Sequence, residues 1–396
     1  MRKKTIKDID VKGKVCLMRV DFNVKLDSTW NILDDERIRA SLSTIYNLIW
    51  RWAKIALISH LGRPEEKWPA TSLQIVVDRL KLYIQQDHFC LADLDDEAAT
   101  RWCVDALDNG EVMMFENIRW YDGEKNDIDG FWKYLASFGD IFVNDGFGVS
   151  HREDASVIWI AKYLPSVAGL LLADEIKYME LTVNRRQARP FVAVIWGKKA
   201  EEKIWVTNAL LKKVDDILLW GWIVNTFMKA RGCEVGTSFY EPNMVDEVKE
   251  IMWWAMDKPC WLVLPKDFVV ADKISPDANI SIVDYDKIPK NKMALDIWPK
   301  TREKYQKILK QAWFILWIWP MGVYEVNQFR DWNDAIMNAI AESDASSFVW
   351  WGDTIASVAK HPKKEYISHV STWGWATLKF LEFGTLPGIE VLDSKE

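Results

Sequence analysis

The 396-residue sequence lacks the features of several large protein classes. Its five cysteines are scattered, odd in number and contain no Cys-x-x-Cys pair, which excludes a zinc site and a disulfide framework and favours a reducing compartment. The basic N-terminus is not followed by an apolar run, and the most apolar stretch, 312–323, is too short to cross a bilayer and contains Pro320. We therefore expect a cytoplasmic protein with no membrane segment.

Positive charge is also not in excess. The net charge of -7 argues against a nucleic-acid surface, which would need a basic stripe. The common phosphate motifs are missing, because no Walker A pattern occurs and no Gly-x-Gly-x-x-Gly opens a helix after a strand. The absence of that dinucleotide fingerprint makes a two-domain dehydrogenase a weak alternative.

Glycine is scarcer than tryptophan, with 18 glycines against 24 tryptophans. Tryptophan is ordinarily one of the rarer residues and glycine one of the commonest. The frequencies of glycine and tryptophan are therefore abnormal. The rest of the composition, with 49% hydrophobic and 28% charged residues, is typical of a globular protein.

Strand-like apolar runs alternate with amphipathic helical stretches along the whole chain. The first half has predicted helices over 35–52, 71–84 and 97–107, and its predicted strands are 15–20, 55–59, 112–115 and 141–144. The second half has predicted strands at 191–195, 217–220, 261–264, 314–317 and 348–350. This alternation predicts an α/β protein of two Rossmann-like, three-layer domains with mostly parallel sheets, joined by a long helix and separated by a cleft.

The predicted organisation has four regions. They are an N-terminal domain at 1–172, a linker helix at 173–189, a second domain at 190–382 and a tail at 383–396 that can return to the N-terminal domain. Chains of this length ordinarily form two domains.

Charged side chains recur where the predicted strands end. Arg19, Asp21 and Asn23 alternate at the end of the first strand, so they are predicted to point the same way. Later junctions bring further basic groups, namely Arg37, His60 with Arg63, Arg119, and His151 with Arg152. Because ligands of parallel sheets bind beyond the carboxyl ends of the strands, we expect a crevice that holds an anion.

Six short strings occur in order and together resemble phosphoglycerate kinase over residues 5–387. They are Arg19-Val-Asp-Phe-Asn23, Ser59-His-Leu-Gly-Arg-Pro64, Glu116-Asn-Ile-Arg119, Asn144-Asp-Gly-Phe-Gly148 with His151-Arg152, Pro320-Met-Gly-Val-Tyr-Glu325, and Gly352-Asp-Thr354. The resemblance implies a glycolytic enzyme that transfers phosphate reversibly from 1,3-bisphosphoglycerate to ADP with Mg²⁺, giving 3-phosphoglycerate and ATP. It also implies a cytoplasmic, hinge-bending monomer that binds only small-molecule substrates.

The resemblance assigns roles residue by residue. The catalytic positions are Arg37, Lys203 and Lys199. The N-terminal domain would bind the triose phosphate through Asp21, Phe22, Asn23, Arg37, His60, Leu61, Gly62, Arg63, Arg119 and Arg152. The second domain would bind nucleotide through Lys199, Lys203, Glu325, Trp351, Gly352, Asp353 and Thr354, with Asp353 as the metal ligand. Taken singly, Arg37 and Arg119 are more typical of surface ion-pair partners than of ligands, and His60 could be a packed histidine.

Departures from the family are of one kind, because tryptophan stands at positions where the family has glycine. These positions are 52, 159, 196, 205, 220, 222, 298, 319, 350, 351, 373 and 375, many of them in the nucleotide loops, whereas Trp317 matches a family tryptophan. Glycine there lets the backbone approach phosphate, so indoles should block the nucleotide. Two explanations stay open. One is a non-catalytic anion-binding pseudoenzyme, and the other is a UGA codon that the cell reads as glycine.

Overall fold

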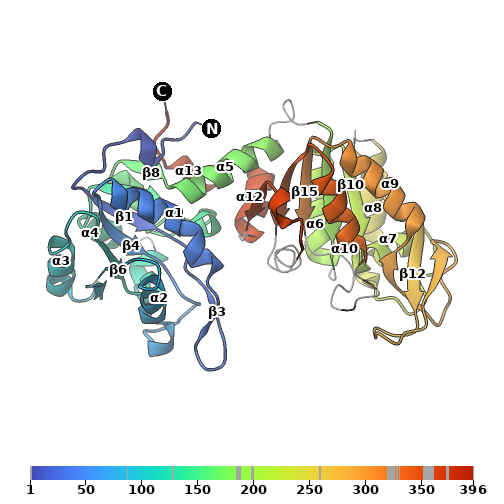
Figure 1. Ribbon diagram of the computed structural model, residues 1–396, viewed down its shortest axis with the longest axis horizontal. Coiled ribbons are helices and arrows are strands. Elements are labelled where there is room, and N and C mark those ends of the chain that lie inside the picture. The colour runs from blue at the N-terminus through green and yellow to red at the C-terminus, as the bar shows by residue number, and fades with distance from the viewer. Residues whose placement is uncertain are drawn as a thin grey trace. The chain divides into compact units, whose positions relative to one another are not determined.

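The computed structural model describes residues 2–86, 88–126, 129–183, 189–197, 200–257, 260–318, 326, 329, 331–350, 361–371 and 374–395. The chain forms two compact units (Figure 1). Unit 1 comprises Met1–Met179 together with Trp375–Glu396, and unit 2 comprises Glu180–Gly374. The chain therefore leaves unit 1, builds unit 2 and returns.

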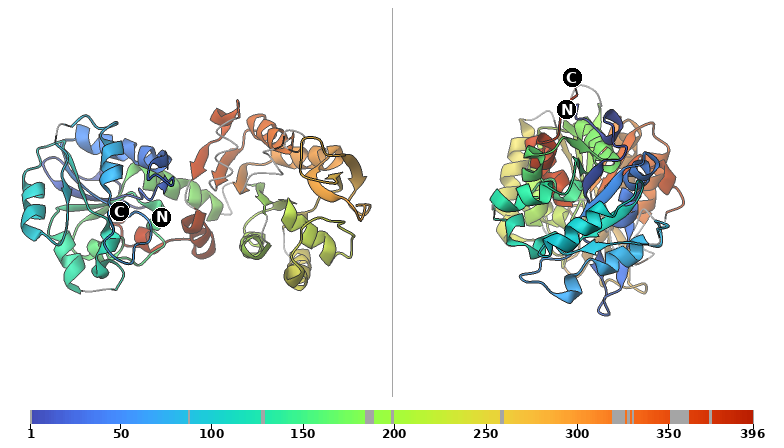
Figure 2. Two further views of the ribbon diagram at one scale, coloured as in Figure 1. Left: turned by 90° about the horizontal axis from the view of Figure 1, so that it is seen from below. Right: turned by 90° about the vertical axis from the view of Figure 1, so that its left-hand side faces the viewer.

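Unit 1 is built on a six-stranded parallel sheet with helices packed around it (Figures 1 and 2). The strand order is β5 (Leu91–Ala92), β6 (Val112–Phe115), β4 (Lys54–Ile58), β1 (Val15–Arg19), β7 (Ile141–Asn144) and β8 (Ser166–Ala168). The helices are α1 (Glu36–Trp50), α2 (Gln74–Leu80), α3 (Glu97–Asp105), α4 (Asp129–Ala136), the first part of α5 (Leu170–Val183) and α13 (Pro387–Glu390). A two-stranded antiparallel ribbon, β2 (Lys25–Leu26) and β3 (Ile32–Asp34), precedes α1.

The central strands of unit 1 are apolar on both faces. All four residues of β6 and of β7 are buried, as are the last four residues of β1 and of β4. A strand covered by helices on both sides has no solvent face, so it reads as a continuous apolar run. Helix α1 closes one face through Ile38, Ile45 and Leu48, which join the same hydrophobic core.

Unit 2 repeats this architecture with a second six-stranded parallel sheet. Its order is β11 (Trp261–Val263), β10 (Asp216–Trp220), β9 (Phe191–Trp196), β15 (Phe314–Ile318), β16 (Ser346–Trp350) and β17 (His369–Ser371). The helices are α6 (Ala200–Leu211), α7 (Trp222–Ala230), α8 (Val245–Met256), α9 (Pro299–Lys310) and α10 (Asp331–Ala341), with α12 (Gly374–Phe383) at the return to unit 1. The predicted α/β class with two parallel sheets is confirmed.

Unit 2 also contains a three-stranded antiparallel sheet that the sequence pattern did not predict. Its order is β13 (Ser281–Asp284), β12 (Asp267–Ala271) and β14 (Met293–Ile297). Only the central strand β12 is buried throughout, and no residue of β13 is. The short, half-polar outer strands gave too weak an alternation to be recognised.

Residues 387–395 pack against the N-terminal strands of unit 1. The Gly388 amide donates to the Ser150 carbonyl at 2.8 Å, and the Asn144 side-chain amide donates to the Gly388 carbonyl at 2.8 Å. A β-bridge joins Lys3 to Ser394. The two ends of the chain are therefore held together in unit 1.

The structure contains a disulfide that the cysteine spacing did not predict. The structure joins Cys90 and Cys103 in a disulfide across 13 residues, whereas the spacing predicted none. The bond arises because Cys90, just before β5, and Cys103, on α3, come to a Cα–Cα distance of 6.1 Å, a proximity that only the tertiary fold creates. No helix in the described ranges is long and apolar enough to span a bilayer.

Candidate functional site

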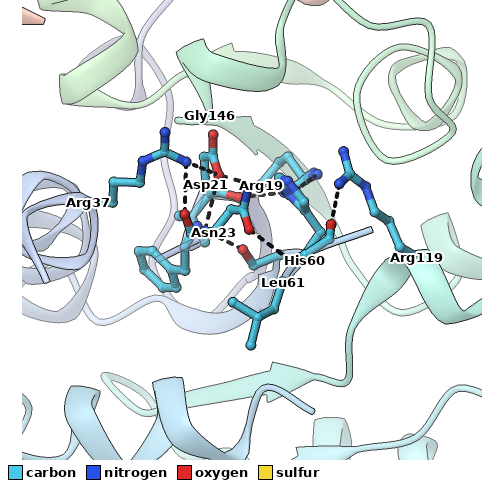
Figure 3. Close-up of polar contacts among 12 residues, drawn as sticks. Arg19, Asp21, Asn23, Arg37, His60, Leu61, Arg119 and Gly146 are labelled. Carbon is cyan, nitrogen blue, oxygen red and sulfur yellow. Dashed lines mark hydrogen bonds and ion pairs between the residues drawn. The ribbon is translucent and has the colours of Figure 1, made fainter. Parts of the chain in front are cut away.

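The polar side chains predicted to bind an anion gather in unit 1, beyond the carboxyl ends of β1 and β4 (Figure 3). These two strands are hydrogen-bonded neighbours in the sheet, so the segments that follow them begin side by side. The Asn23 side-chain oxygen accepts a 2.8 Å hydrogen bond from the Gly62 amide and so ties the two segments together. Parallel pairing thus positions the Asp21–Asn23 turn against the His60–Gly62 turn.

Arg37 approaches this turn from the first turn of α1. Its Nη1 donates to the Asn23 carbonyl at 3.0 Å and to Asp21 Oδ1 at 3.3 Å. Asp21 is buried, whereas the Arg37 side chain keeps 31% of its surface exposed. The two contacts fix the direction of a guanidinium group that still reaches solvent.

Arg19 and His60 form the buried floor of the site. Arg19 is fully buried, its Nε donates to Ser156 Oγ at 2.8 Å, and its Nη2 lies 3.3 Å from His60 Nδ1. Burial, followed by the positive charges of Arg19 and Arg119, holds the pKa of His60 well below its ordinary value. The imidazole is therefore neutral, and because arginine only donates, His60 Nδ1 accepts and Nε2 carries the proton.

Arg119 lies on the other side of the turn from Arg37, and the charge of Arg152 acts on it. Arg119 Nη1 donates to the Gly62 carbonyl at 2.5 Å, and Figure 3 shows this contact opposite Arg37. Arg119 is 93% buried, and burial together with the charges of Arg152 and Arg19 lowers its pKa to about 10. Within the described part of the chain, Nε and Nη2 of Arg119, Nε of Arg152 and Nδ1 of His151 are buried without a hydrogen-bond partner.

The other predicted triose-phosphate residues contribute in different ways. Phe22 and Leu61 are core side chains, so only their backbone can face the site. The Phe22 amide is bound to Ser59 Oγ at 2.9 Å and the Leu61 carbonyl to the Asn117 side chain at 2.8 Å. Arg63 follows Gly62 directly and is exposed.

Sequence reasoning missed a buried network beneath the site. Ser156 donates to Glu124 from its hydroxyl at 2.6 Å and from its amide at 2.9 Å, and it accepts from Arg19. Burial raises the pKa of Glu124 to about 7, although Arg19 acts in the opposite direction. The recurring basic residues drew attention, whereas single Glu and Ser residues far along the chain carried no sequence signal.

Burial makes Asp145, the residue after β7, a source of pH dependence. Its pKa is raised to about 7 against an unfolded value of about 4. Since the folded pKa is the higher one, its contribution to stability is complete below about pH 4 and is lost as pH rises to about 7. From about pH 5 to about pH 8, urea melts should show a loss of about 2–3 kcal/mol in the free energy of unfolding from Asp145.

Asp145→Asn should remove the share of the pH-dependent loss that Asp145 contributes and leave the share of Glu124, whose pKa is also raised to about 7, whereas the exposed Asp108→Asn should retain both. Equal pH profiles for the two variants would contradict the assignment to Asp145.

The predicted nucleotide residues fall almost entirely outside the described residues. Lys199, Glu325, Trp351, Gly352, Asp353 and Thr354 all lie there. Lys203 lies on α6, but its side chain is also outside the description. Within the described ranges no group of three or more His, Cys, Asp or Glu side chains is arranged to hold a metal ion.

Three of the six parallel strands of unit 2 end in tryptophan. Trp196 ends β9, Trp220 ends β10 and Trp350 ends β16. A Cβ at Gly221, which has a φ of 82°, would lie 2.1 Å from Trp196 Nε1, so the indole rests directly on that glycine. The Trp196 indole therefore fills the space next to Gly221, the residue that follows β10.

The structure is a two-unit α/β protein with a cluster of cationic side chains at the strand ends of unit 1. The family model for phosphoglycerate kinase matches residues 6–383. The phosphoglycerate kinases of Chloroflexus aurantiacus and Chloroflexus aggregans are 42% and 41% identical to the chain over their full lengths. The solved phosphoglycerate kinase of Coxiella burnetii has a TM-score of 0.89 at 34% identity, and that of Pyrococcus horikoshii 0.82 at 28%, each covering 98% of both chains.

The chain therefore belongs to the phosphoglycerate kinase family. This membership assigns it phosphoglycerate kinase activity, a glycolytic phosphotransferase function, in agreement with the six sequence strings. The family acts on a magnesium-bound nucleotide.

Proposed function

We propose that unit 1 binds the triose phosphate and that unit 2 binds ADP or ATP with Mg²⁺. The observation that supports the first half is the crowding of buried guanidinium groups. Arg119 is buried, and this burial, followed by the positive charges of Arg152 and Arg19, lowers its pKa. Arginine forks that lack internal acceptors match the oxygens of phosphate and carboxylate, so a bound anion would relieve both the repulsion and the unmet hydrogen bonds.

Each residue has a proposed role in holding the triose phosphate. Arg63, Arg119 and Arg152 bind its non-transferred phosphate, and His60 donates from Nε2 to a ligand oxygen. Asp21 and Asn23 orient the substrate and hold Arg37, with backbone groups of Phe22, Leu61 and Gly62 completing the pocket. Arg37 faces the transferred phosphoryl group.

The reaction needs no general base. An oxygen of the terminal ADP phosphate attacks the acyl phosphorus of 1,3-bisphosphoglycerate, and the bond from phosphorus to the carboxyl oxygen breaks. The leaving group is the ionised carboxylate of 3-phosphoglycerate, so no proton moves. Catalysis then consists of positioning and of cationic stabilisation of the spread charge, which Arg37, Lys199 and Lys203 supply.

For the nucleotide we propose Lys199, Lys203, Glu325, Trp351, Gly352, Asp353 and Thr354, with Asp353 holding Mg²⁺, which neutralises phosphate charge. The two sets of ligands belong to different units, so turnover requires a hinge-bending approach. We also propose that the enzyme works as a cytoplasmic monomer without nucleic-acid or membrane partners.

One observation favours a second candidate, a non-catalytic anion-binding protein. The Trp196 indole rests on Gly221 at the strand ends of unit 2, where the family places its nucleotide loops. If tryptophan is the native residue there, the nucleotide would be excluded while the anion site of unit 1 stays intact.

Separate titrations with Mg-ADP and with 3-phosphoglycerate, followed by calorimetry, distinguish the two candidates. We expect the native protein, purified from its own cells, to bind both ligands. Binding of 3-phosphoglycerate alone would favour the plugged protein. Failure to bind 3-phosphoglycerate would contradict the site proposed in unit 1.

A further inference from the structure

Only two described residues other than glycine have a positive φ, and both are tryptophans. Trp30 has a φ of 66° and Trp52 a φ of 58°. The left-handed region is disfavoured for residues with a Cβ, and the exceptions are mainly Asn, Asp and His. A bulky aromatic residue is therefore least expected where this backbone turns.

Trp52 occupies a helix-ending position that is typical of glycine. Its amide donates to the Ile49 carbonyl at 2.9 Å, and the next amide, of Ala53, donates to the Leu48 carbonyl at 3.1 Å. This pair of bonds is the Schellman motif, in which the residue after the C-cap is left-handed and usually glycine. The backbone after α1 therefore adopts the geometry of a glycine C′ residue.

Trp30 occupies a left-handed position in a β-hairpin loop, where glycine is also typical. Its amide donates to the Asp27 carbonyl at 3.1 Å, and the Asp27 amide donates to the Asn31 carbonyl at 2.9 Å, which closes a three-residue loop between β2 and β3. The last residue of such a loop is left-handed and commonly glycine. Trp30 was not singled out from the sequence, so it is an independent observation.

The indole side chains at positions 30 and 52 bury little surface and therefore contribute little to the stability of the fold. Trp30 and Trp52 are 53% and 59% exposed, although tryptophan is on average a highly buried residue. In the described part of unit 2, the indole N–H groups of Trp196 and Trp220 are buried without a hydrogen-bond partner, as is that of Trp317, so this feature does not by itself separate the two kinds of position. A buried donor without a partner destabilises the fold.

We propose that the codons at positions 30, 52, 196 and 220 are UGA and that the cell reads them as glycine. A single decoding rule accounts for one residue type recurring at a helix end, a hairpin and two strand ends. Neutral drift in a pseudoenzyme would not place the same residue at left-handed positions of unit 1, remote in sequence from the nucleotide strings. With glycine, the strand ends of unit 2 present bare backbone amides to an anion, a consequence that rests on the proposed function.

The proposal is tested without any assay of activity. We expect UGA at codons 30, 52, 196 and 220, UGG at codon 317, and peptide masses of the native protein that show glycine at the four positions and tryptophan at 317. UGG at the four codons, or peptide masses that show tryptophan there, would overturn it. The outcome of neither measurement, codon sequence or peptide mass, depends on whether the chain is a phosphoglycerate kinase.

The physical basis is tested on recombinant chain with tryptophan as written. Trp52→Gly should raise Tm and shift the unfolding equilibrium about fivefold to thirtyfold toward the folded state, because the left-handed strain is removed. Trp317→Gly is the matched control, since Trp317 is fully buried within β15 and its loss should lower Tm strongly. A fall in Tm for Trp52→Gly would contradict the strain.

Activity is then compared between the chain as written and a glycine-restored chain, which carries Trp→Gly at 30, 52, 159, 196, 205, 220, 222, 298, 319, 350, 351, 373 and 375. We expect turnover only from the glycine-restored chain. Full turnover from the chain as written would contradict the block of nucleotide binding by the indoles, whereas the codons and peptide masses alone decide the decoding proposal.

Discussion

Arg37→Ala should lower the turnover of the glycine-restored chain by on the order of a thousandfold while the affinity for Mg-ADP stays unchanged. An arginine that stabilises a phosphoryl group in flight contributes effects of about this size. Arg37 is suited to that role because Asp21 and the Asn23 carbonyl hold one edge of its guanidinium group. Steady-state kinetics and calorimetric titration with Mg-ADP provide the two measurements.

Arg39→Ala is the matched control, because Arg39 lies on the same helix. Its side chain is 55% exposed and pairs with Asp35 at 2.9 Å, and exposed ion pairs contribute little. Arg37→Lys keeps the charge but loses the planar fork, so its turnover should lie between those of the parent and Arg37→Ala. An unchanged turnover in Arg37→Ala would remove Arg37 from the mechanism.

Arg19→Met should destabilise unit 1 by about 3–5 kcal/mol, the typical cost of removing one partner of a buried charge pair. Arg19 is fully buried and shares Ser156 with the buried carboxylate of Glu124. Without the guanidinium, Glu124 would keep its burial and lose its nearest opposite charge. Chemical denaturation followed by fluorescence measures the loss.

Glu124→Gln in the Arg19→Met background should recover part of the stability, because the uncompensated charge is then gone. Arg39→Met, at an exposed position of α1, should leave the midpoint of unfolding close to that of the parent. If Arg19→Met and Arg39→Met unfold at the same denaturant concentration, the buried pair has no stabilising role.

The parallel sheets were predictable because their central strands are continuous apolar runs. β6 and β7 have the predicted bounds, β1 ends one residue earlier than predicted, and β4 is shifted by one residue toward the N-terminus. Helix bounds were less predictable. The stretch predicted as one helix over 71–84 contains α2 only from Gln74 to Leu80, because Pro69–Thr71 forms a separate 3₁₀ turn and Ser72 is extended.

The site was predictable only where it follows the strand ends. Asp21, Asn23, His60 and Gly62 lie together because β1 and β4 are neighbours. Arg19 was predicted to point the same way as Asp21 and Asn23, but β1 ends at Arg19, so strand alternation does not extend to the other two. The contacts from Ser156 to Arg19 and Glu124 join residues far apart in the sequence, and no local pattern encodes them.

The return of the chain to unit 1 has a consequence for how the protein is made. Residues 387–395 form hydrogen bonds with Ser150 and Asn144 and a β-bridge with Lys3. The ribosome must therefore synthesise all of unit 2 before unit 1 can gain these contacts. Until then unit 1 lacks the contacts of residues 387–395, whereas all segments of unit 2 precede these residues in the sequence. Unit 2 can therefore complete its folding before unit 1 does, and unit 1 gains its last contacts only when residues 387–395 have been synthesised.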